Sequence, residues 1–336
     1  MSGANTGARG GGVKVAVLSF AHERAETYAR LLRDMPEVDL VTADPDAAPG
    51  DPARGRAMAE RLGVSHVDSW DEVFAARPGA VVVTSEVDRR RELVERAAEA
   101  GAHVLCEHPL AAKEADAKAM VDACDTAGVR LTLASPACFG GAFAAVRQGI
   151  ADGVVGTLST IHGTYHCAPA ARGAVDGGAL GANAPFLLDL VDAVLDGEPA
   201  AQVYAQANHV LSGQSGVESA ALVSVRYPSG TVAAIDCGWS LSPAGGPFVT
   251  FVGDRASVEY DACPRLLDGF DAATGGARWE PGGADPYSLM LKDFLSATGD
   301  GRRTGPDGAA GLRALRVVQA AYESVHTGQP VDIAAP

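Results

Sequence analysis

Apolar runs and helical stretches alternate along the first 135 residues of the chain. Short runs rich in β-branched residues are typical of buried strands, and most are followed by a segment whose apolar residues recur at helical spacing. Strands are predicted at Val13–Leu18, Val38–Thr42, Ala80–Thr84, His103–Cys106 and Val129–Leu133. Helices are predicted at or near Ala21–Met35, Ala53–Gly63, Asp88–Ala100 and Glu114–Ala127. This alternation indicates βαβ units and a doubly wound parallel sheet with right-handed crossovers.

From about Ser135 onward the pattern changes to short strands. Turn signals such as Pro228–Ser229–Gly230 separate them and indicate antiparallel hairpins. The strands are predicted at Leu158–His166, Gln202–His209, Ala220–Tyr227, Thr231–Cys237, Phe248–Val252 and Ala256–Tyr260. Helices are predicted at Ala142–Ala151, around Phe186–Leu195, at Tyr287–Thr298 and at Gly308–Thr327, the last with an apolar stripe.

The predicted fold is therefore α/β with two domains. Residues 13–135 are expected to form a Rossmann-type doubly wound parallel sheet, and residues 136–336 an α+β domain with a mostly antiparallel open sheet. The Gly-rich residues 1–12 are predicted to be a disordered arm. Two stacked domains leave a cleft between them, and small ligands bind in such clefts.

Composition narrows the choice of partners. The 336 residues carry a formal net charge of −15, which would repel nucleic acids and anionic membranes. The six cysteines form no CxxC pair, which favours reduced thiols in a cytoplasm. Neither a signal peptide nor an apolar run of membrane-spanning length is expected, and the histidines show no spacing typical of a metal site. The expected partner is a small-molecule substrate.

One stretch, VLCEHPLA at Val104–Ala111, combines an apolar strand with reactive side chains at its end. Ligands of open parallel sheets lie beyond the carboxyl ends of the strands, so Glu107 and His108 are placed for chemistry. Pro109 lacks an N–H group and biases His108 toward an extended backbone. The alternative is an ordinary turn between a strand and a helix.

The turn after the first strand contains none of the three glycines of a dinucleotide fingerprint. It has Ser19, Ala21 and Arg24 at those positions. A serine can still make the turn, and the following helix N-terminus still attracts an anion. The alternative is a turn that binds nothing. Asp44, after the second strand, is placed to hold ribose hydroxyls and would favour NAD over NADP, or else belongs to a plain surface turn.

Taken together, these features resemble the Gfo/Idh/MocA family, from about residue 13 to residue 333. VLCEHPLA stands where the family has a Glu-Lys-Pro motif, and Asp176–Asp189 where it has a Gly-Gly…Asp…His…Asp segment. The resemblance implies a nucleotide-binding first domain and a second domain for substrate and oligomerisation, as a homodimer or homotetramer. It also implies NAD(P)-dependent oxidation or reduction of sugars, polyols or related secondary alcohols. The cofactor-binding residues expected on this basis are Ser19, Phe20, Ala21, His22, Asp44, Thr84, Glu107, His108 and Pro109.

The chain departs from the family pattern at the reacting positions. His108 stands at the family's lysine, Ala182 at its aspartate and Phe186 at its histidine, while Asp189 keeps the last acidic position. A histidine still suits proton transfer at neutral pH, whereas alanine and phenylalanine do not. Phe186 is interpreted as packing or as a wall of the cleft. Asp189 either faces the cleft or is a paired carboxylate.

Replacement groups are expected on the strand Thr160–Cys167. Its alternation puts His162, Thr164 and His166 on one face and Tyr165 on the other. Tyr165 or His166 together with His108 would form an acid–base set, so these three are the candidate catalytic residues. The candidate substrate residues are Asn183, Phe186 and Asp189, although Asn183 could instead be the N-cap of its helix.

Three functions stay open on the sequence. The first is an NAD(P)-dependent oxidoreductase with an altered active site, acting on a sugar-like or other small hydroxylated substrate, with NAD as the expected cofactor. The second is a cofactor-independent lyase, isomerase or cyclase that reuses the cleft. The third is a non-catalytic binding protein. The first is preferred because the resemblance extends over nearly the whole chain.

Overall fold

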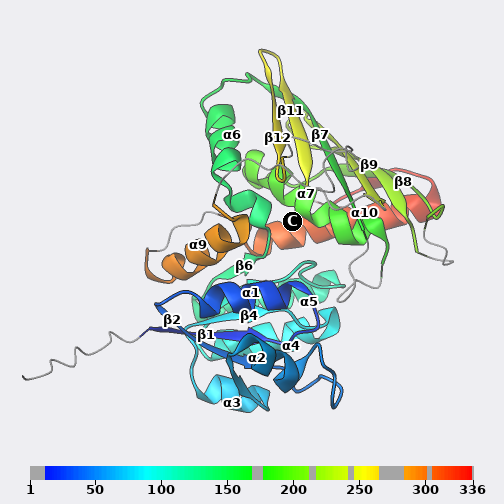
Figure 1. Ribbon diagram of the computed structural model, residues 1–336. Coiled ribbons are helices and arrows are strands. Elements are labelled where there is room, and N and C mark those ends of the chain that lie inside the picture. Colours follow the sequence, from blue (N-terminus) through cyan, green and yellow to red (C-terminus); the bar gives the residue numbers. More distant parts are fainter. Residues whose placement is uncertain are drawn as a thin grey trace, which may run out of the picture.

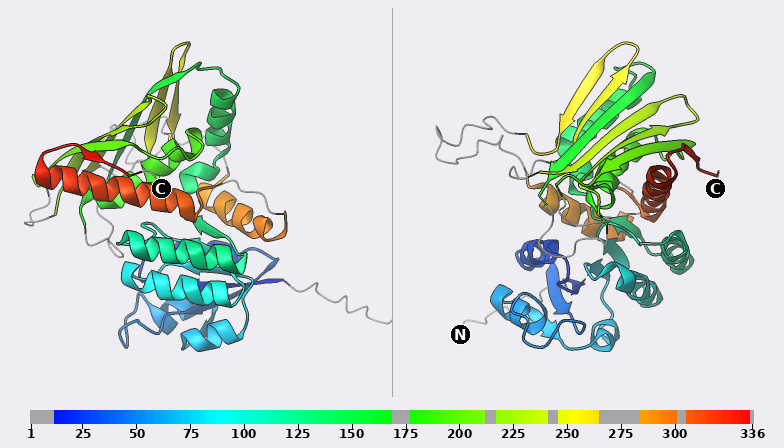
Figure 2. Two further views of the ribbon diagram at one scale, coloured as in Figure 1. Left: turned by 180° about the vertical axis from the view of Figure 1, so that it is seen from behind. Right: turned by 90° about the vertical axis from the view of Figure 1, so that its right-hand side faces the viewer.

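A computed structural model gives the structure of the chain (Figure 1). It describes residues 12–168, 177–211, 217–240, 246–264, 284–300 and 305–334, with the backbone only for 297–300. The predicted arm lies outside these residues except for Gly12. Two domains are stacked in Figures 1 and 2, and helices α7, α9 and α10 lie between the two sheets.

The first domain is built on a six-stranded sheet in the order β3-β2-β1-β4-β5-β6, with every neighbouring pair parallel. Helices cover both faces because successive strand residues point to opposite sides. Ala16 and Leu18 pack toward α4 and α5, whereas Val15 and Val17 pack toward α1. The elements are β1 (Val13–Leu18), α1 (Arg24–Arg33), β2 (Val38–Ala43), α2 (Gly55–Leu62), β3 (Ser65–Val67), α3 (Trp70–Ala75), β4 (Ala80–Val83), α4 (Val87–Glu99), β5 (His103–Cys106), α5 (Glu114–Ala127) and β6 (Leu131–Leu133). The doubly wound parallel sheet is confirmed.

The second domain is built on a seven-stranded sheet in the order β12-β11-β7-β10-β9-β8-β13. The pair β7 and β10 is parallel and the other pairs are antiparallel, which confirms the mostly antiparallel sheet. The elements are a 3₁₀ turn η1 (Pro136–Phe139), α6 (Gly141–Ala151), β7 (Leu158–Cys167), α7 (Ala179–Val194), β8 (Gln202–Asn208), β9 (Ala220–Arg226), β10 (Val232–Trp239), β11 (Phe248–Gly253), β12 (Ser257–Asp261), α9 (Pro286–Asp300), α10 (Gly308–Thr327) and β13 (Val331–Asp332).

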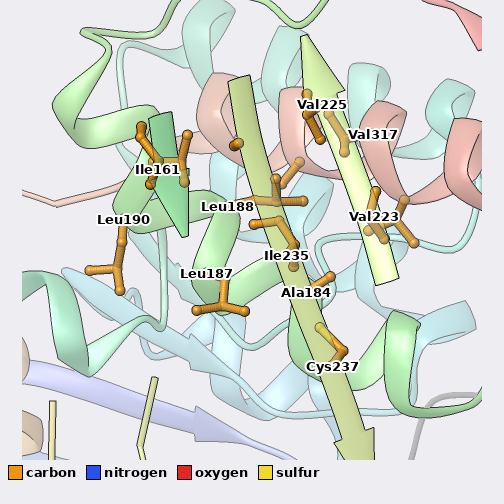
Figure 3. Close-up of a cluster of buried hydrophobic side chains, with 14 of the residues drawn as sticks. Ile161, Ala184, Leu187, Leu188, Leu190, Val223, Val225, Ile235, Cys237 and Val317 are labelled. Carbon is orange, nitrogen blue, oxygen red and sulfur yellow. The ribbon is translucent and has the colours of Figure 1, made fainter. Parts of the chain in front are cut away.

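The core of the second domain lies between one face of this sheet and the helices α7 and α10. Figure 3 shows its centre, where Ile161 of β7 and Ile235 of β10 face Leu187 and Leu188 of α7. Val317 adds the contact from α10. This packing fixes α7 against the sheet, and α7 carries the second-domain residues of the site.

The N-terminus of α7 differs from its prediction. Asn183 lies inside the helix, and the N-cap is Gly178. Glu218 takes over the capping role, because its backbone oxygen accepts the Ala179 N–H and its carboxylate accepts the Leu180 N–H. The N-cap prediction for Asn183 is therefore wrong, since the cap comes from a distant segment that local sequence does not reveal.

Candidate active site

A cavity of about 530 Å³ lies between the domains, beyond the carboxyl ends of β1 and β5. The two domains contribute polar and aromatic side chains to its wall, among them His22, Arg24, His108, Tyr165, Asn183 and Phe186. The topology puts the strand ends of the first domain opposite α7 and β7 of the second. This is the position in which open α/β sheets bind their ligands.

His108 and Asp189 form a buried pair at this cavity. The His108 Nε2 atom is 2.7 Å from Asp189 Oδ2, and the two residues are only 5% and 1% exposed. An ionised carboxylate only accepts hydrogen bonds, so this contact assigns the Nε2 proton to the imidazole. With Nε2 as the donor, Nδ1 is the ring atom left to accept a hydrogen bond, and no described protein group donates to it. Asp189 Oδ1 is buried and has no hydrogen-bond partner among the described residues.

Phe186 is the ring around which the polar groups gather. Its centroid is 4.8 Å from that of His108 and 6.0 Å from that of Tyr165. The Arg24 guanidinium lies over the same ring, 4.7 Å from the centroid. Phe186 therefore separates and positions an imidazole, a phenol and a guanidinium at the cavity wall.

Glu107 lies beneath this wall and is fully buried. Its carboxylate accepts hydrogen bonds from Arg24 Nη1 (3.1 Å), the Tyr28 hydroxyl (2.7 Å) and the His108 N–H (3.0 Å). Burial alone would raise the pKa of Glu107, but the Arg24 charge, followed by His22 and the Tyr28 hydrogen bond, lowers it to about 2. Glu107 is thus an anion that fixes the backbone of His108.

Arg90 holds the same turn from the other side. It is buried, and its Nη1 donates to the backbone oxygens of Glu107 and Pro109. The His108–Pro109 peptide bond is cis. Pro109 lines the cavity beside His108.

Tyr165 and His166 lie on opposite faces of β7, as the alternation predicts. Tyr165 lines the cavity, and burial raises its pKa, so the phenol stays protonated and can donate. His166 lies on the exposed outer face, where its Nε2 is 2.9 Å from Asp236 Oδ1. Tyr165 and His108 therefore line the same cavity, each packed on Phe186, whereas His166 points away from it.

Asn183 lies at the cavity, but its side chain already has partners. Its amide donates to the backbone oxygens of Tyr165 (3.2 Å) and Gly238 (3.3 Å), and its Oδ1 accepts from Cys167 (3.3 Å). These contacts tie α7 to β7 and β10. Asn183 thus fixes the site's geometry rather than offering a free amide to a substrate.

The loop between β1 and α1 makes the tight turn of a nucleotide-binding loop, although it contains no glycine. Ser19 has the left-handed φ of 77° that normally favours glycine. The N–H groups of Phe20, Ala21 and His22 donate to Asp44, to the Ser19 hydroxyl and to the Thr84 backbone oxygen. Phosphate would therefore meet side chains and the α1 N-terminus here, in place of free loop amides.

Asp44 occupies a different role from the one predicted. Its buried carboxylate accepts hydrogen bonds from Ser19 Oγ, the Phe20 and Gly55 N–H groups and two nitrogens of Arg54. Burial would raise its pKa, but the Arg54 contacts lower it. Five donors saturate the carboxylate, so Asp44 joins β1, β2 and α2 and has no acceptor left for ribose. Thr84 is likewise internal, and its hydroxyl donates to Ser19 O at 2.7 Å.

Glu86 is a carboxylate that sequence reasoning did not single out. It follows β4, and its Oε1 accepts from Arg54 Nη1 at 2.5 Å. Its Oε2 is buried and has no hydrogen-bond partner among the described residues. Arg54 also contacts Ser19, so Glu86 lies beside the loop with an unused acceptor. Its position two residues after the predicted strand Ala80–Thr84 was the available signal.

Two further residues after β1 contribute side chains to the cavity wall. Arg24 stands at a glycine position of the fingerprint, where it is too bulky for close helix packing but its cation could meet a phosphate, and its side chain reaches the cavity. His22 also lines the cavity, and its Nδ1 accepts the Arg24 N–H at 3.2 Å. Burial lowers the pKa of His22, so its ring is neutral and presents an Nε2–H donor.

The residues around the Ser19 loop could hold a dinucleotide, although they differ from the usual glycine-rich fingerprint. Ser19 makes the tight turn of a nucleotide loop with its left-handed φ. The N-terminus of α1 can attract a phosphate. The Glu86 oxygen without a described partner can accept a hydrogen bond from a ribose hydroxyl. Among the described residues, no cluster of three or more His, Cys, Asp or Glu side chains is placed to hold a metal ion. No described helix is long and apolar enough to cross a membrane.

This fold and site define a two-domain protein of the dinucleotide-binding oxidoreductase class. The model of the oxidoreductase family GFO_IDH_MocA, NAD-binding Rossmann fold, matches residues 46–135, and the model of its C-terminal alpha/beta domain matches residues 147–333. The chain belongs to the Gfo/Idh/MocA oxidoreductase family. The first match begins after β1, the Ser19 loop and Asp44, the segment in which this chain departs from the fingerprint.

Curated relatives and solved structures agree with this assignment. The chain is 26% identical to a D-apiose dehydrogenase of Paraburkholderia graminis over 313 residues, covering 84% of this chain and 81% of the relative. It is 27% identical over 287 residues to inositol 2-dehydrogenase 2 of Paenarthrobacter aurescens, covering 82% and 86%. A structure of scyllo-inositol dehydrogenase from Lactobacillus casei, with NAD(H) and scyllo-inositol, has the same fold, with a TM-score of 0.79, 15% identity and coverage of 96% and 99%.

Proposed function

We propose that the protein is an NAD-dependent oxidoreductase that acts on a secondary hydroxyl or carbonyl group of a sugar-like or polyol substrate. The observation that carries this proposal is the buried His108–Asp189 pair at the cleft, with 2.7 Å between Nε2 and Oδ2. The named relatives act on D-apiose and inositol, which supports a polyhydroxylated substrate.

In this proposal His108 is the acid–base residue. Asp189 accepts a hydrogen bond from the Nε2–H group and thereby orients the ring, so that Nδ1 is the atom that takes the proton of the substrate hydroxyl. The Asp189 charge also stabilises the imidazolium that results. In the reverse direction, the same imidazolium returns the proton to the carbonyl oxygen. Tyr165, which packs on the same Phe186 ring as His108, donates a hydrogen bond to the substrate oxygen.

When bound, NAD⁺ would supply the acceptor for the hydride of the carbinol carbon. The alcohol would then become a carbonyl group, and His108 would hold the hydroxyl proton. Ser19 makes the turn that admits the nucleotide, and the α1 N-terminus attracts its phosphates. Glu86 replaces Asp44 as the acceptor for ribose hydroxyls and disfavours a 2′-phosphate. A cytoplasmic location and a homodimer or homotetramer remain part of this proposal.

A second candidate is a cofactor-independent enzyme that moves protons with the same pair. It is favoured by one observation, the internal hydrogen bonds that occupy the loop N–H groups at Phe20, Ala21 and His22. The first function is preferred because the oxidoreductase family models match residues 46–135 and 147–333, which include His108 and Asp189.

The pair is tested by substitution and steady-state kinetics on the best substrate of a screen of sugars, polyols and their acids with NAD⁺. His108→Ala is expected to lower kcat by about 10²–10⁴-fold, because proton transfer contributes that much. Asp189→Asn should lower kcat by roughly tenfold or more, since the amide no longer fixes the tautomer. His166→Ala, on the outer face, is the matched control and should leave kcat unchanged. Full activity in His108→Ala would refute the assignment.

A further inference from the structure

Arg24 is the first residue of α1 and contributes the cationic side chain of the cavity wall. Among the described residues that line the cavity, it is the only lysine or arginine. Its side chain is 22% exposed, and its guanidinium lies over Phe186, 4.7 Å from the ring centroid. His108 packs on the same ring, with 4.8 Å between centroids. The guanidinium and the acid–base residue therefore face one cavity from a shared aromatic support.

The contact with Glu107 does not use up this guanidinium. Only Nη1 donates to Glu107, at 3.1 Å, although an arginine has five N–H donors. Glu107 also accepts from the Tyr28 hydroxyl and the His108 N–H, and it does not line the cavity. No other acceptor for Arg24 occurs in the described part of the chain, and none of its nitrogens is buried without a partner. Its remaining donors therefore reach the cavity.

The Arg24 guanidinium is the group of the cavity wall that can bind an anion directly. Among the described residues that line the cavity, Glu23 is the one carboxylate, and it is an exposed residue at the start of α1. The remaining polar wall groups, such as His22, Tyr165 and Asn183, are uncharged donors or internally bonded amides. An arginine fork with free N–H groups matches the geometry of a carboxylate.

We propose that Arg24 anchors a carboxylate of the substrate, so that the cleft takes a hydroxy acid, such as a sugar acid, whose reacting hydroxyl meets His108. This inference rests on the proposed function for the role of His108 and adds the substrate class. Arg24 stands where a dinucleotide fingerprint has its last glycine. The long Arg24 side chain turns into the cavity from that position, where it favours a substrate with a negatively charged carboxylate.

The experiment compares matched acids and alcohols by calorimetric titration of the full chain without cofactor. The probes are D-gluconate against D-glucitol and D-glycerate against glycerol. The wild type is expected to bind the acid at least about tenfold more tightly in one or both pairs, as a charge-assisted hydrogen bond provides. Arg24→Met should abolish this preference, and Arg24→Lys should keep part of it. Equal binding of acid and alcohol in both pairs by the wild type would overturn the proposal.

Two controls keep the result interpretable. If Arg24→Met fails to fold because Glu107 loses its partner, the double variant Arg24→Met/Glu107→Gln removes both charges and takes its place. NADH is titrated into the same variants. If the Arg24 variants still prefer the acid over the alcohol, the proposal is overturned. If these variants also lose NADH binding, Arg24 is assigned to the phosphates of the cofactor instead. Absence of NADH binding in the wild type bears on the proposed function alone, because the acid preference is measured without cofactor.

Discussion

At the scale of single residues, the site depends on pairings between segments that are distant in sequence. His108 and Asp189 are 81 positions apart, and Arg24 and Glu107 are 83 apart. Sequence reasoning identified His108 and Asp189 from the strand end and from the resemblance. It left open whether Asp189 is paired, because the partner of a buried carboxylate is set by tertiary packing.

Asp44 and Glu86 show what residue-level reasoning does not reveal. Both follow predicted strands, and a carboxylate at either position is compatible with a ribose contact. The structure saturates Asp44 with five donors and leaves one oxygen of Glu86 without a partner among the described residues. Arg54 donates to both carboxylates and thereby occupies Asp44. It lies ten residues beyond Asp44, in a stretch of sequence without a recognisable motif.

The buried charge of Glu107 predicts a pH dependence of stability. Its pKa is lowered from 4.5 to about 2 in the folded chain, so its contribution is present above pH 4.5 and is lost as the pH falls toward 2. That shift corresponds to about 3 kcal/mol of folding free energy. Glu107→Gln should therefore be less stable than the wild type at pH 7, and the difference should shrink between pH 4.5 and pH 2.

Urea unfolding at pH 7, 5, 4 and 3, monitored by circular dichroism, measures this difference. The matched control is Glu99→Gln, an exposed glutamate of α4, which should follow the wild type at every pH. A gap between Glu107→Gln and the wild type that stays constant down to pH 3 would contradict a lowered Glu107 pKa.

At the scale of elements, α7 connects the core to the site. Leu187 and Leu190 pack into the core, and Phe186 and Asp189 of the same helix reach the cavity side. β7 approaches α7 closely at Gly163, where an added Cβ would lie 3.1 Å from Leu187 Cδ2. The position of α7, and with it the His108–Asp189 contact, therefore depends on a small residue in the sheet.

Gly163→Val is expected to destabilise the protein by about 1–3 kcal/mol, because the added methyl groups push on Leu187 and displace α7. It should also lower kcat, since Asp189 moves with the helix. Thermal unfolding and kinetics of the same preparation measure both effects. The control Gly141→Ala, where a Cβ meets no atom within 4 Å, should be neutral or slightly stabilising. A Gly163→Val variant with wild-type stability would disprove the close packing.

Most elements were predictable because their apolar spacing is long and regular. The strands Val13–Leu18 and His103–Cys106 and the helices Glu114–Ala127 and Gly308–Thr327 have the predicted bounds. The strand β3 and the helix α3 were missed, since three and six residues are too few to show a period. The start of α7 was misplaced because its cap comes from Glu218.

At the scale of the whole molecule, the closing helices bind the two domains to each other. Met290, Leu291 and Phe294 of α9 pack into the core of the first domain beside α1. On α10, Leu315 contacts the first domain, while Val317 packs in the second. Figure 2 shows both helices between the sheets. A sequence boundary near residue 135 therefore does not separate the two domains completely, because later helices pack on the first domain. The order of helices and strands along the sequence does not reveal these contacts.

The arrangement of the whole molecule also locates the function. The cavity lies where strand ends of the first sheet meet α7, and the first domain matches the NAD-binding Rossmann model of the family. The unusual part is the loop around Ser19, where side chains occupy the glycine positions and the N–H groups of Phe20, Ala21 and His22 are engaged. Whether this loop binds a nucleotide decides between the two proposed functions.

The most direct measurement is a titration of the nucleotide-free chain with NAD⁺, NADH, NADP⁺ and NADPH, followed by nicotinamide fluorescence and calorimetry. We expect NADH to bind with a Kd in the micromolar range, about −8 kcal/mol, and more tightly than NADPH. Glu86→Gln should weaken NADH binding and narrow that difference, because Glu86 provides the free carboxylate oxygen. Binding of none of the four nucleotides would contradict the oxidoreductase account and favour cofactor-independent proton transfer by His108 and Asp189.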